Sequence, residues 1–225
     1  MHNLTGDHRK LLFKYAVLSA RFEIREFFLK YAVKDVYENI GQVLSFVRMQ
    51  LASFNTNDLT EKPEDILQSG NLVGQSIRDL RSMCRSFYPD KELLKDGGFV
   101  DAIELTIRVL QPGVRPAVVI KGEPVTMHGE LKLITFKILQ DILVIINEVN
   151  GAYKNLVISY MEDNITLTTR YVGSVINWQK NRADDISDSL TIPERIEMFD
   201  GQMNLKQSKN GITSIILKLP LNISL

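Results

Sequence analysis

The sequence predicts an α+β fold in which a long helical hairpin precedes a sandwich of helices on a mixed β-sheet. Two observations predict it. The first 90 residues carry apolar side chains at three- and four-residue steps, and the remaining residues alternate helical with strand-like segments. We therefore expect two domains, a helical hairpin over residues 1–90 and an α/β sandwich over residues 91–225.

The composition excludes several classes of function. The 225 residues include 27 basic and 27 acidic side chains, so the formal net charge is zero. We expect no nucleic-acid partner, because the chain lacks the positive charge that attracts one. No stretch approaches the ~18 consecutive apolar residues of a membrane span. A single cysteine, Cys84, and three scattered histidines suit a cytoplasmic protein without a metal site.

The first predicted helix runs from about residue 7 to residue 54, and a turn-rich segment ending in Pro63 separates it from a second helix over residues 64–87. Their apolar stripes exceed what one hairpin can bury. We therefore expect a homodimer in which two hairpins form a four-helix bundle. The stripes consist of Ile24, Phe27, Phe28, Tyr31, Val36, Ile40, Val43, Leu44, Val47, Leu51 and Phe54, and of Ile66, Val73, Ile77, Leu80, Cys84 and Phe87.

The second half of the chain is expected to place helices over one face of a mixed sheet. The turn formers Lys209, Asn210 and Gly211 suit a hairpin between the last two strands. We predict helices over residues 100–109, 129–149 and 192–199, and strands over residues 117–120, 156–161, 165–171, 202–207 and 213–219.

A short run in the first helix, from Lys34 to Gln42, reads Lys-Asp-Val-Tyr-Glu-Asn-Ile-Gly-Gln. It resembles the phosphoacceptor motif of sensor histidine kinases of the nitrate-sensor type, in which glutamate, leucine and histidine precede an acid, any residue, isoleucine, glycine and glutamine. Tyr37 occupies the place of the histidine. The resemblance implies a kinase fold and argues against kinase chemistry. The matching residues are Asp35, Val36, Glu38, Ile40, Gly41 and Gln42.

The order of the elements extends the resemblance to residues 21–221. A helical hairpin followed by a sandwich is similar to the dimerization domain and the GHKL-type ATP-binding domain of histidine kinases. The alternative is an unrelated two-domain α+β protein. The residues that resemble the link between the family's two domains are Arg78, Asp79, Leu80, Arg81, Ser86, Phe87, Tyr88, Pro89, Leu93, Gly98, Phe99, Ala102 and Ile103.

Active members of that family hold ATP and magnesium with three groups of residues, and each is degenerate here. Asp141 keeps the acid of the first group, but Ile145 stands in place of the metal-binding asparagine. Tyr171, before Gly173, stands where a carboxylate should accept the adenine amino group. The glycines of the phosphate lid are almost all lost around residues 189–193 and 211–213. The resemblance thus implies a pseudokinase without ATP or magnesium as a cofactor.

In the same family, the helix that carries the histidine also docks the receiver domain of a response regulator. We therefore expect this chain to bind a receiver domain or a partner kinase without phosphoryl transfer. Glu38 occupies the place of a base but lacks the imidazole that it would activate. The candidate contacts are Lys34, Tyr37, Glu38, Asn39 and Gln42, with Arg48 as an outer candidate.

Three alternatives remain open at this level. Gln42 could orient a water for the hydrolysis of a receiver's aspartyl phosphate, as the corresponding glutamine does in related kinases. The sandwich could bind ATP through displaced ligands such as Asn147 or Asp141, although Asn147 is turned by roughly 200° from position 145 on a helix of 3.6 residues per turn. The chain could also form a heterodimer with an active kinase that supplies the histidine.

Overall fold

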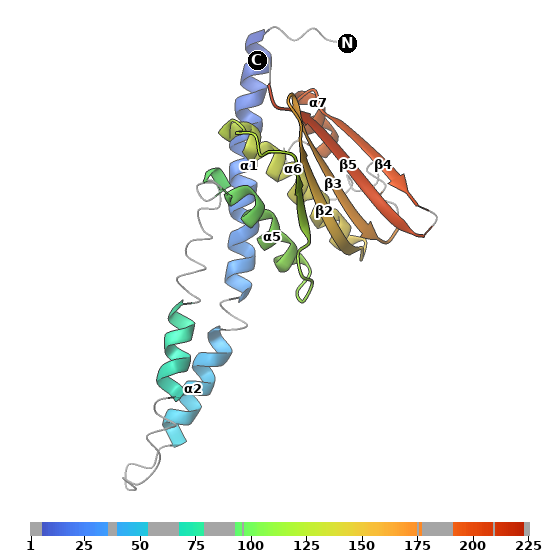
Figure 1. Cartoon of the computed structure of the whole chain (residues 1–225). Coiled ribbons are helices and arrows are strands. Elements are labelled where there is room, and N and C mark those ends of the chain that lie inside the picture. Colours follow the sequence, from blue (N-terminus) through green and yellow to red (C-terminus); the bar gives the residue numbers. More distant parts are fainter. Residues whose placement is uncertain are drawn as a thin grey trace. The chain divides into compact units, whose positions relative to one another are not determined.

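The computed structural model describes residues 6–35, 40–53, 68–78, 93–95, 97–174, 176, 191–208 and 210–222 (Figure 1). The chain forms two compact units, one of residues 1–22 with 93–225 and one of residues 23–92. The expected division assigned the first 22 residues to the helical hairpin, whereas here they group with the sandwich. One contact that joins them to it is the ring pair of Phe13 and Phe199, whose centroids are 5.2 Å apart.

The N-terminal helices are α1, Gly6–Asp35, and α2, Gly41–Ser53. The expected helix over residues 7–54 is thus helical on both sides of residues 36–39, which lie outside the described residues. A further helix covers residues 68–78, within the expected second helix over residues 64–87. These helices precede an α/β sandwich, and the predicted α+β fold class is confirmed.

Several side chains of the expected dimer stripe are already buried within the chain. Ile24, Phe28, Ile40 and Val47 are at most 5% exposed. Side chains buried in this way cannot cover a partner hairpin, so the stripe as a whole is not the surface that the sequence predicted. Leu44 and Ile77 of the stripe are exposed.

Five strands form one mixed sheet in the order β1-β2-β3-β5-β4. β1 is parallel to β2, and the other neighbours are antiparallel. The helices α5, α6 and α7 lie on one face of this sheet (Figure 1). Their bounds are Gly98–Leu110, Gly129–Glu148 and Ile192–Met198, and the strands are Val118–Lys121, Ala152–Tyr160, Asn164–Val172, Gln202–Gln207 and Ile212–Pro220.

The strand sequences explain which face of the sheet the helices cover. Successive side chains of a strand point to opposite faces, and in β3 and β5 every second residue is buried. The helix α6 is buried on most sides, because twelve of its twenty residues are buried. Burying a leucine, isoleucine or phenylalanine side chain contributes about 1.5–3 kcal/mol, so α6 is the centre of the core.

The start of β2 is held by a side chain from the end of α5. Gln111 donates from Nε2 to the carbonyl of Gly151 over 2.6 Å and accepts from the backbone N–H of Tyr153 over 3.1 Å. The hydroxyl of Tyr153 in turn donates to the carbonyl of Ala117 over 2.9 Å. These contacts extend β2 back to Ala152, four residues before the predicted start at residue 156.

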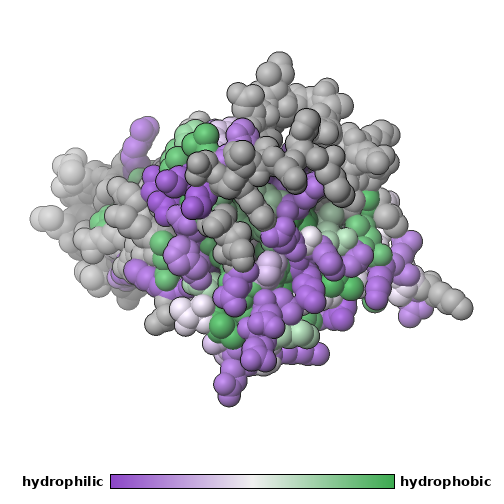
Figure 2. Space-filling model, turned by 90° about the horizontal axis from the view of Figure 1, so that it is seen from above, coloured by the Kyte–Doolittle hydropathy of each residue, from purple (hydrophilic) through white to green (hydrophobic). Residues whose placement is uncertain are grey.

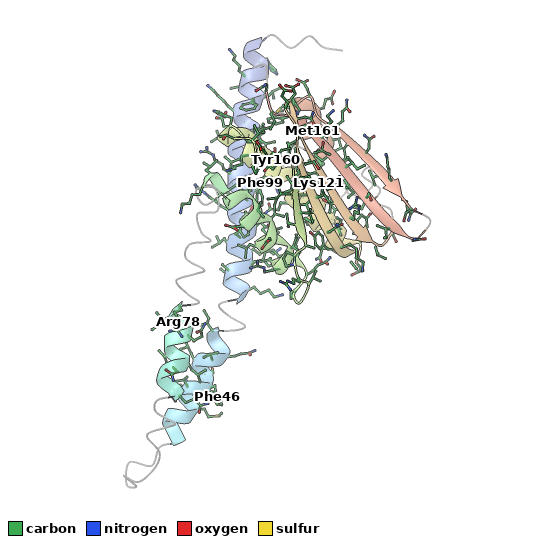
Figure 3. All side chains as sticks on the ribbon, viewed as in Figure 1. Phe46, Arg78, Phe99, Lys121, Tyr160 and Met161 are labelled. Atoms are coloured by element: carbon green, nitrogen blue, oxygen red, sulfur yellow. The ribbon has the colours of Figure 1, made fainter. Side chains whose placement is uncertain are left out.

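At the opposite end of the parallel pair, β1 ends at Lys121 and β2 ends at Tyr160 (Figure 3). Gly122 there has φ of 78°, and a Cβ on it would lie 2.5 Å from the carbonyl oxygen of Tyr160. Both the left-handed backbone and the close approach require glycine at this position. On the face that Figure 2 shows, hydrophilic residues lie next to hydrophobic ones among the coloured residues.

Replacing Gly151 with alanine should destabilise the sandwich, because the new Cβ would lie 2.8 Å from the backbone oxygen of Ile146 and 2.8 Å from Cδ2 of Tyr171. We expect a loss of about 1–3 kcal/mol in the free energy of unfolding, as for other overpacked sites. Chemical denaturation of the wild type and the variant would measure it.

Gly129→Ala is the matched control. Its new Cβ would meet only Cδ2 of Leu94 at 3.0 Å, and that exposed side chain can rotate away. Equal stability of Gly151→Ala and Gly129→Ala would contradict the close packing at Gly151.

Candidate functional site

The residues that the sequence assigned to a nucleotide site come from α6 and from the end of β3. Asp141 and Ile145 lie one turn apart on α6, Tyr171 lies in β3, and Gly173 follows that strand. Gly151, between α6 and β2, lies at the point where these elements meet. A Cβ on Gly173 would lie 3.0 Å from Cα of Gly151 and 3.4 Å from Cδ2 of Tyr171.

The ring of Tyr171 occupies the interior of this end of the sandwich. The residue is 0% exposed, and its ring lies against both Gly151 and Gly173. Its hydroxyl donates to the carbonyl of Ser174 over 2.9 Å. Burial raises the pKa of the Tyr171 hydroxyl, so the buried side chain is a neutral donor. It provides no carboxylate that could accept the amino group of an adenine.

Asp141 is paired with a basic side chain of its own helix. Its Oδ1 lies 2.5 Å from Nζ of Lys137, one turn earlier on α6. The lysine side chain is 9% exposed and the carboxylate 23% exposed. A cation bound at Asp141 would have to displace the ammonium group and leave it poorly solvated, which is costly for a buried charge. The pair therefore opposes metal binding at Asp141.

The remaining positions offer little to a metal ion. Ile145 is half-buried and has no oxygen to coordinate a hard cation. Asn147, the displaced ligand considered above, is half-buried in the last turn of α6. Within the described part of the chain, no three or more His, Cys, Asp or Glu side chains gather closely enough to hold a metal.

The sequence interpretation missed three residues of this region: Lys137, Gly151 and Gln111. Lys137 could have been found, because it precedes Asp141 by four residues on one helix, the spacing of a helical ion pair. The other two could not. Gly151 lies against Tyr171, twenty residues later, and Gln111 holds a backbone carbonyl forty residues away.

The docking residues predicted on the first helices are only partly described. Lys34 lies at the end of α1 and Gln42 at the start of α2, and both are exposed, as is Arg48. Tyr37, Glu38 and Asn39 lie outside the described residues. None of the helices in the described ranges combines the length and apolar character that crossing a membrane requires.

No protein-family model matches the sequence, and no curated protein matches it. Several solved structures are similar to it. The blue-light activated histidine kinase of Erythrobacter litoralis EL346 is 14% identical with a TM-score of 0.44, over 83% of this chain and 60% of that one. The histidine kinase domain of the same protein is 11% identical with a TM-score of 0.44, over 89% of this chain and 94% of the domain.

The histidine kinase AdeS of Acinetobacter baumannii is 13% identical with a TM-score of 0.38, over 81% of this chain and 97% of that one. The chain thus spans less than two thirds of the full Erythrobacter kinase and nearly all of the isolated domain.

Tyr171→Phe should make the protein less sensitive to alkaline pH. Because burial raises the pKa of Tyr171, the unfolded state releases this proton first, near the reference pKa of about 10. The contribution of the Tyr171 hydroxyl to the free energy of unfolding is therefore fully present below that pH and is lost as the pH rises above it. Removing the hydroxyl removes one such group, so the loss of unfolding free energy above this pH should be shallower.

Urea denaturation at a series of pH values would measure this effect. At neutral pH the variant should lose only about 1 kcal/mol, the net contribution of one hydrogen bond. Identical pH profiles for the wild type and the variant would show that Tyr171 ionises as readily in the folded protein as in the unfolded chain.

Proposed function

We propose that this protein acts in two-component signal transduction as a catalytically silent, histidine kinase-like chain that binds a receiver domain or a partner kinase. The observation that carries the proposal is the buried ring of Tyr171, in the place where the resemblance requires an adenine-binding carboxylate. The substitution of Tyr37 for the phosphoacceptor histidine agrees with it.

The cost of opening the site supports the absence of nucleotide binding. A ligand in the space of Tyr171 would have to expel an aromatic ring that is 0% exposed. Removing the packing of a buried aromatic side chain costs about 3–5 kcal/mol. No carboxylate or asparagine would compensate for that cost, because Tyr171 and Ile145 stand at those positions.

The metal half of the site is opposed by charge. Magnesium binds through oxygen ligands and keeps several waters. Asp141 is the carboxylate that remains, and it is engaged by Lys137. A bound nucleotide would therefore find no free carboxylate for its metal ion at this position. The negative charge of its phosphates would be poorly neutralised.

Binding a signalling partner requires neither a phosphoacceptor histidine nor a nucleotide site. Lys34, Gln42 and Arg48 are exposed polar side chains on α1 and α2. An amphipathic helix of a receiver domain can dock against such a helical surface through its own apolar and charged residues. The proposed role is therefore to hold or titrate a signalling partner.

The purified protein should bind no Mg-ATP. We expect no saturable heat in isothermal titration with protein at roughly 100 µM, which would place the Kd above about 1 mM. A histidine kinase domain that retains the asparagine and the aspartate provides the positive control. Saturable micromolar binding by this chain would contradict the proposal and favour an ATP-binding kinase with displaced ligands.

A receiver domain from the same organism should bind the chain, and Lys34→Glu should weaken binding by about tenfold if Lys34 is an interface anchor. Biolayer interferometry with immobilised receiver domains would measure the affinities. Lys14→Glu, the same substitution at an exposed position nearer the start of α1, is the matched control. Equal affinities of the two variants would remove Lys34 from the interface.

Gln42→Ala separates docking from the phosphatase alternative. A protein that only binds should leave the lifetime of a phosphorylated receiver unchanged, with or without the substitution. If the wild type shortens that lifetime and Gln42→Ala restores it by about tenfold or more, within the range of general acid–base and positioning effects, the chain is a phosphatase.

A further inference from the structure

The strands of the sheet carry basic side chains and no acidic ones. The helices α5, α6 and α7, in contrast, together hold more acidic than basic residues. The zero net charge of the chain therefore hides an uneven distribution, in which a positive sheet lies beside acidic helices. The charged residues of the strands are Lys121, Lys154, Arg170, Lys206 and Lys218.

The strand register places four of these cations on the face of the sheet that points away from the helices. Successive side chains of a strand point to opposite faces. The neighbours of Arg170 in β3 and of Lys218 in β5 are at most 1% exposed, so both cations point outward. Lys121 and Lys206 are paired with outward-pointing residues of β2 and β5. We call this side of the sheet, with α5, α6 and α7 behind it (Figure 1), the outer face.

The four cations of the outer face lie in two separate rows. Strand pairing aligns Lys121 with Lys218 across the sheet, about 14 Å apart at the spacing of neighbouring strands. It aligns Arg170 with Lys206 in a second row, four residues or about 13 Å further along the strands. Lys154, in the bulge of β2, is exposed beside Arg170. The positive charge is therefore spread over the whole face.

None of these four cations forms a salt bridge within the part of the chain that the structure describes. Hydroxyl and amide groups, which commonly bind phosphate oxygens, lie between the two rows and beside them. Two aliphatic side chains of the same face are exposed, Val119 at 43% and Val172 at 39%. The outer face thus combines unpaired cations, polar groups and exposed aliphatic groups. The polar residues are Asn155, Ser159, Thr166, Thr168, Asn204 and Ser214.

We propose that the outer face docks on the surface of an anionic lipid bilayer. Each Lys or Arg near such a surface strengthens binding about fivefold. Val119 and Val172 can enter the boundary between headgroups and acyl chains, where apolar side chains add to the electrostatic attraction. Acidic residues on the far side of helices of about 10 Å diameter lie beyond the Debye length of about 8 Å, so they repel the lipid only weakly.

A single-stranded nucleic acid suits the outer face less well. Its bases stack on aromatic side chains, and the aromatic residues of the strands point toward the helices. Tyr153 and Tyr171 are paired and buried on that side, and Tyr160 is paired with the buried Ile165. The proposal concerns the sheet alone, so it stands or fails independently of the proposed signalling function.

Sedimentation of the full chain with lipid vesicles tests the docking. Vesicles of phosphatidylcholine and phosphatidylglycerol, mixed at about two to one, should carry the protein into the pellet, because they attract the cations of the outer face. Salt at about 1 M, where the Debye length is about 3 Å, should release it. Equal sedimentation with pure phosphatidylcholine vesicles, or none with either kind, would overturn the proposal.

A pair of double variants separates the outer face from net charge. Lys206→Gln with Lys218→Gln should weaken binding to the mixed vesicles by about 25-fold, since two cations are removed. Arg108→Gln with Lys132→Gln removes the same charge from α5 and α6 and should bind as the wild type does. Both pairs are surface residues, and circular dichroism would check that the fold is kept. Equal weakening by the two pairs would refute docking through the outer face.

A fluorescent label reports which face meets the lipid. In a Cys84→Ser background, an environment-sensitive dye on Val119→Cys should shift to the blue on the mixed vesicles, because that position enters the headgroup boundary. The same dye on Asp101→Cys, exposed on α5, should not shift. A shift at Asp101→Cys alone would contradict the proposed orientation.

Fluorescence anisotropy with labelled DNA, as a duplex and as a single strand, tests the other polyanion. We expect binding to DNA to be weaker than binding to the mixed vesicles at the same salt concentration, which must be matched because both depend on it. Tighter binding to DNA that is lost in Lys206→Gln with Lys218→Gln would overturn the bilayer proposal and assign the outer face to nucleic acid.

Discussion

The burial of α6 is the constraint on which the rest of the sandwich depends. Because this helix is covered on most sides, even its polar residues Lys137 and Gln140 are taken into the interior. Lys137 is compensated by Asp141 one turn later. Because α6 is packed on most sides, the position of its last turn is fixed. Ile146 of that turn lies against Gly151, and Tyr171 of β3 lies against the same glycine.

The filled end of the sandwich follows from this packing. With α6 fixed, the space between its last turn and the end of β3 holds either a ligand or a side chain, and the ring of Tyr171 occupies it. The ring comes so close to Gly151 that a Cβ there would lie 2.8 Å from its Cδ2, and a Cβ on Gly173 would lie 3.0 Å from Cα of Gly151. Gly151 thus makes room for the aromatic ring and Gly173 for the backbone of Gly151, and both roles are structural and independent of phosphate binding.

Local patterns were enough to predict most of the sandwich from the sequence. Alternating burial in β3 and β5, and the apolar face of α6, are set by neighbouring residues, so their bounds came within one or two residues. The start of β2 depends on Gln111 and Tyr153, which act over about forty residues of sequence. The place of the first 22 residues was equally hidden, because the contact of Phe13 with Phe199 spans nearly the whole chain.

The two faces of α1 show why a single hydrophobic stripe was too simple an interpretation of that helix. Apolar residues there recur so densely that steps of three and four can be traced along either face, and the sequence alone does not say which face the chain covers. Burial decides it: Phe13, Val17 and Ile24 pack within the chain, whereas Leu18 and Phe22 remain exposed. Two stripes at helical spacing can therefore lie on one helix, and only the packing of the rest of the chain distinguishes the covered stripe from the exposed one.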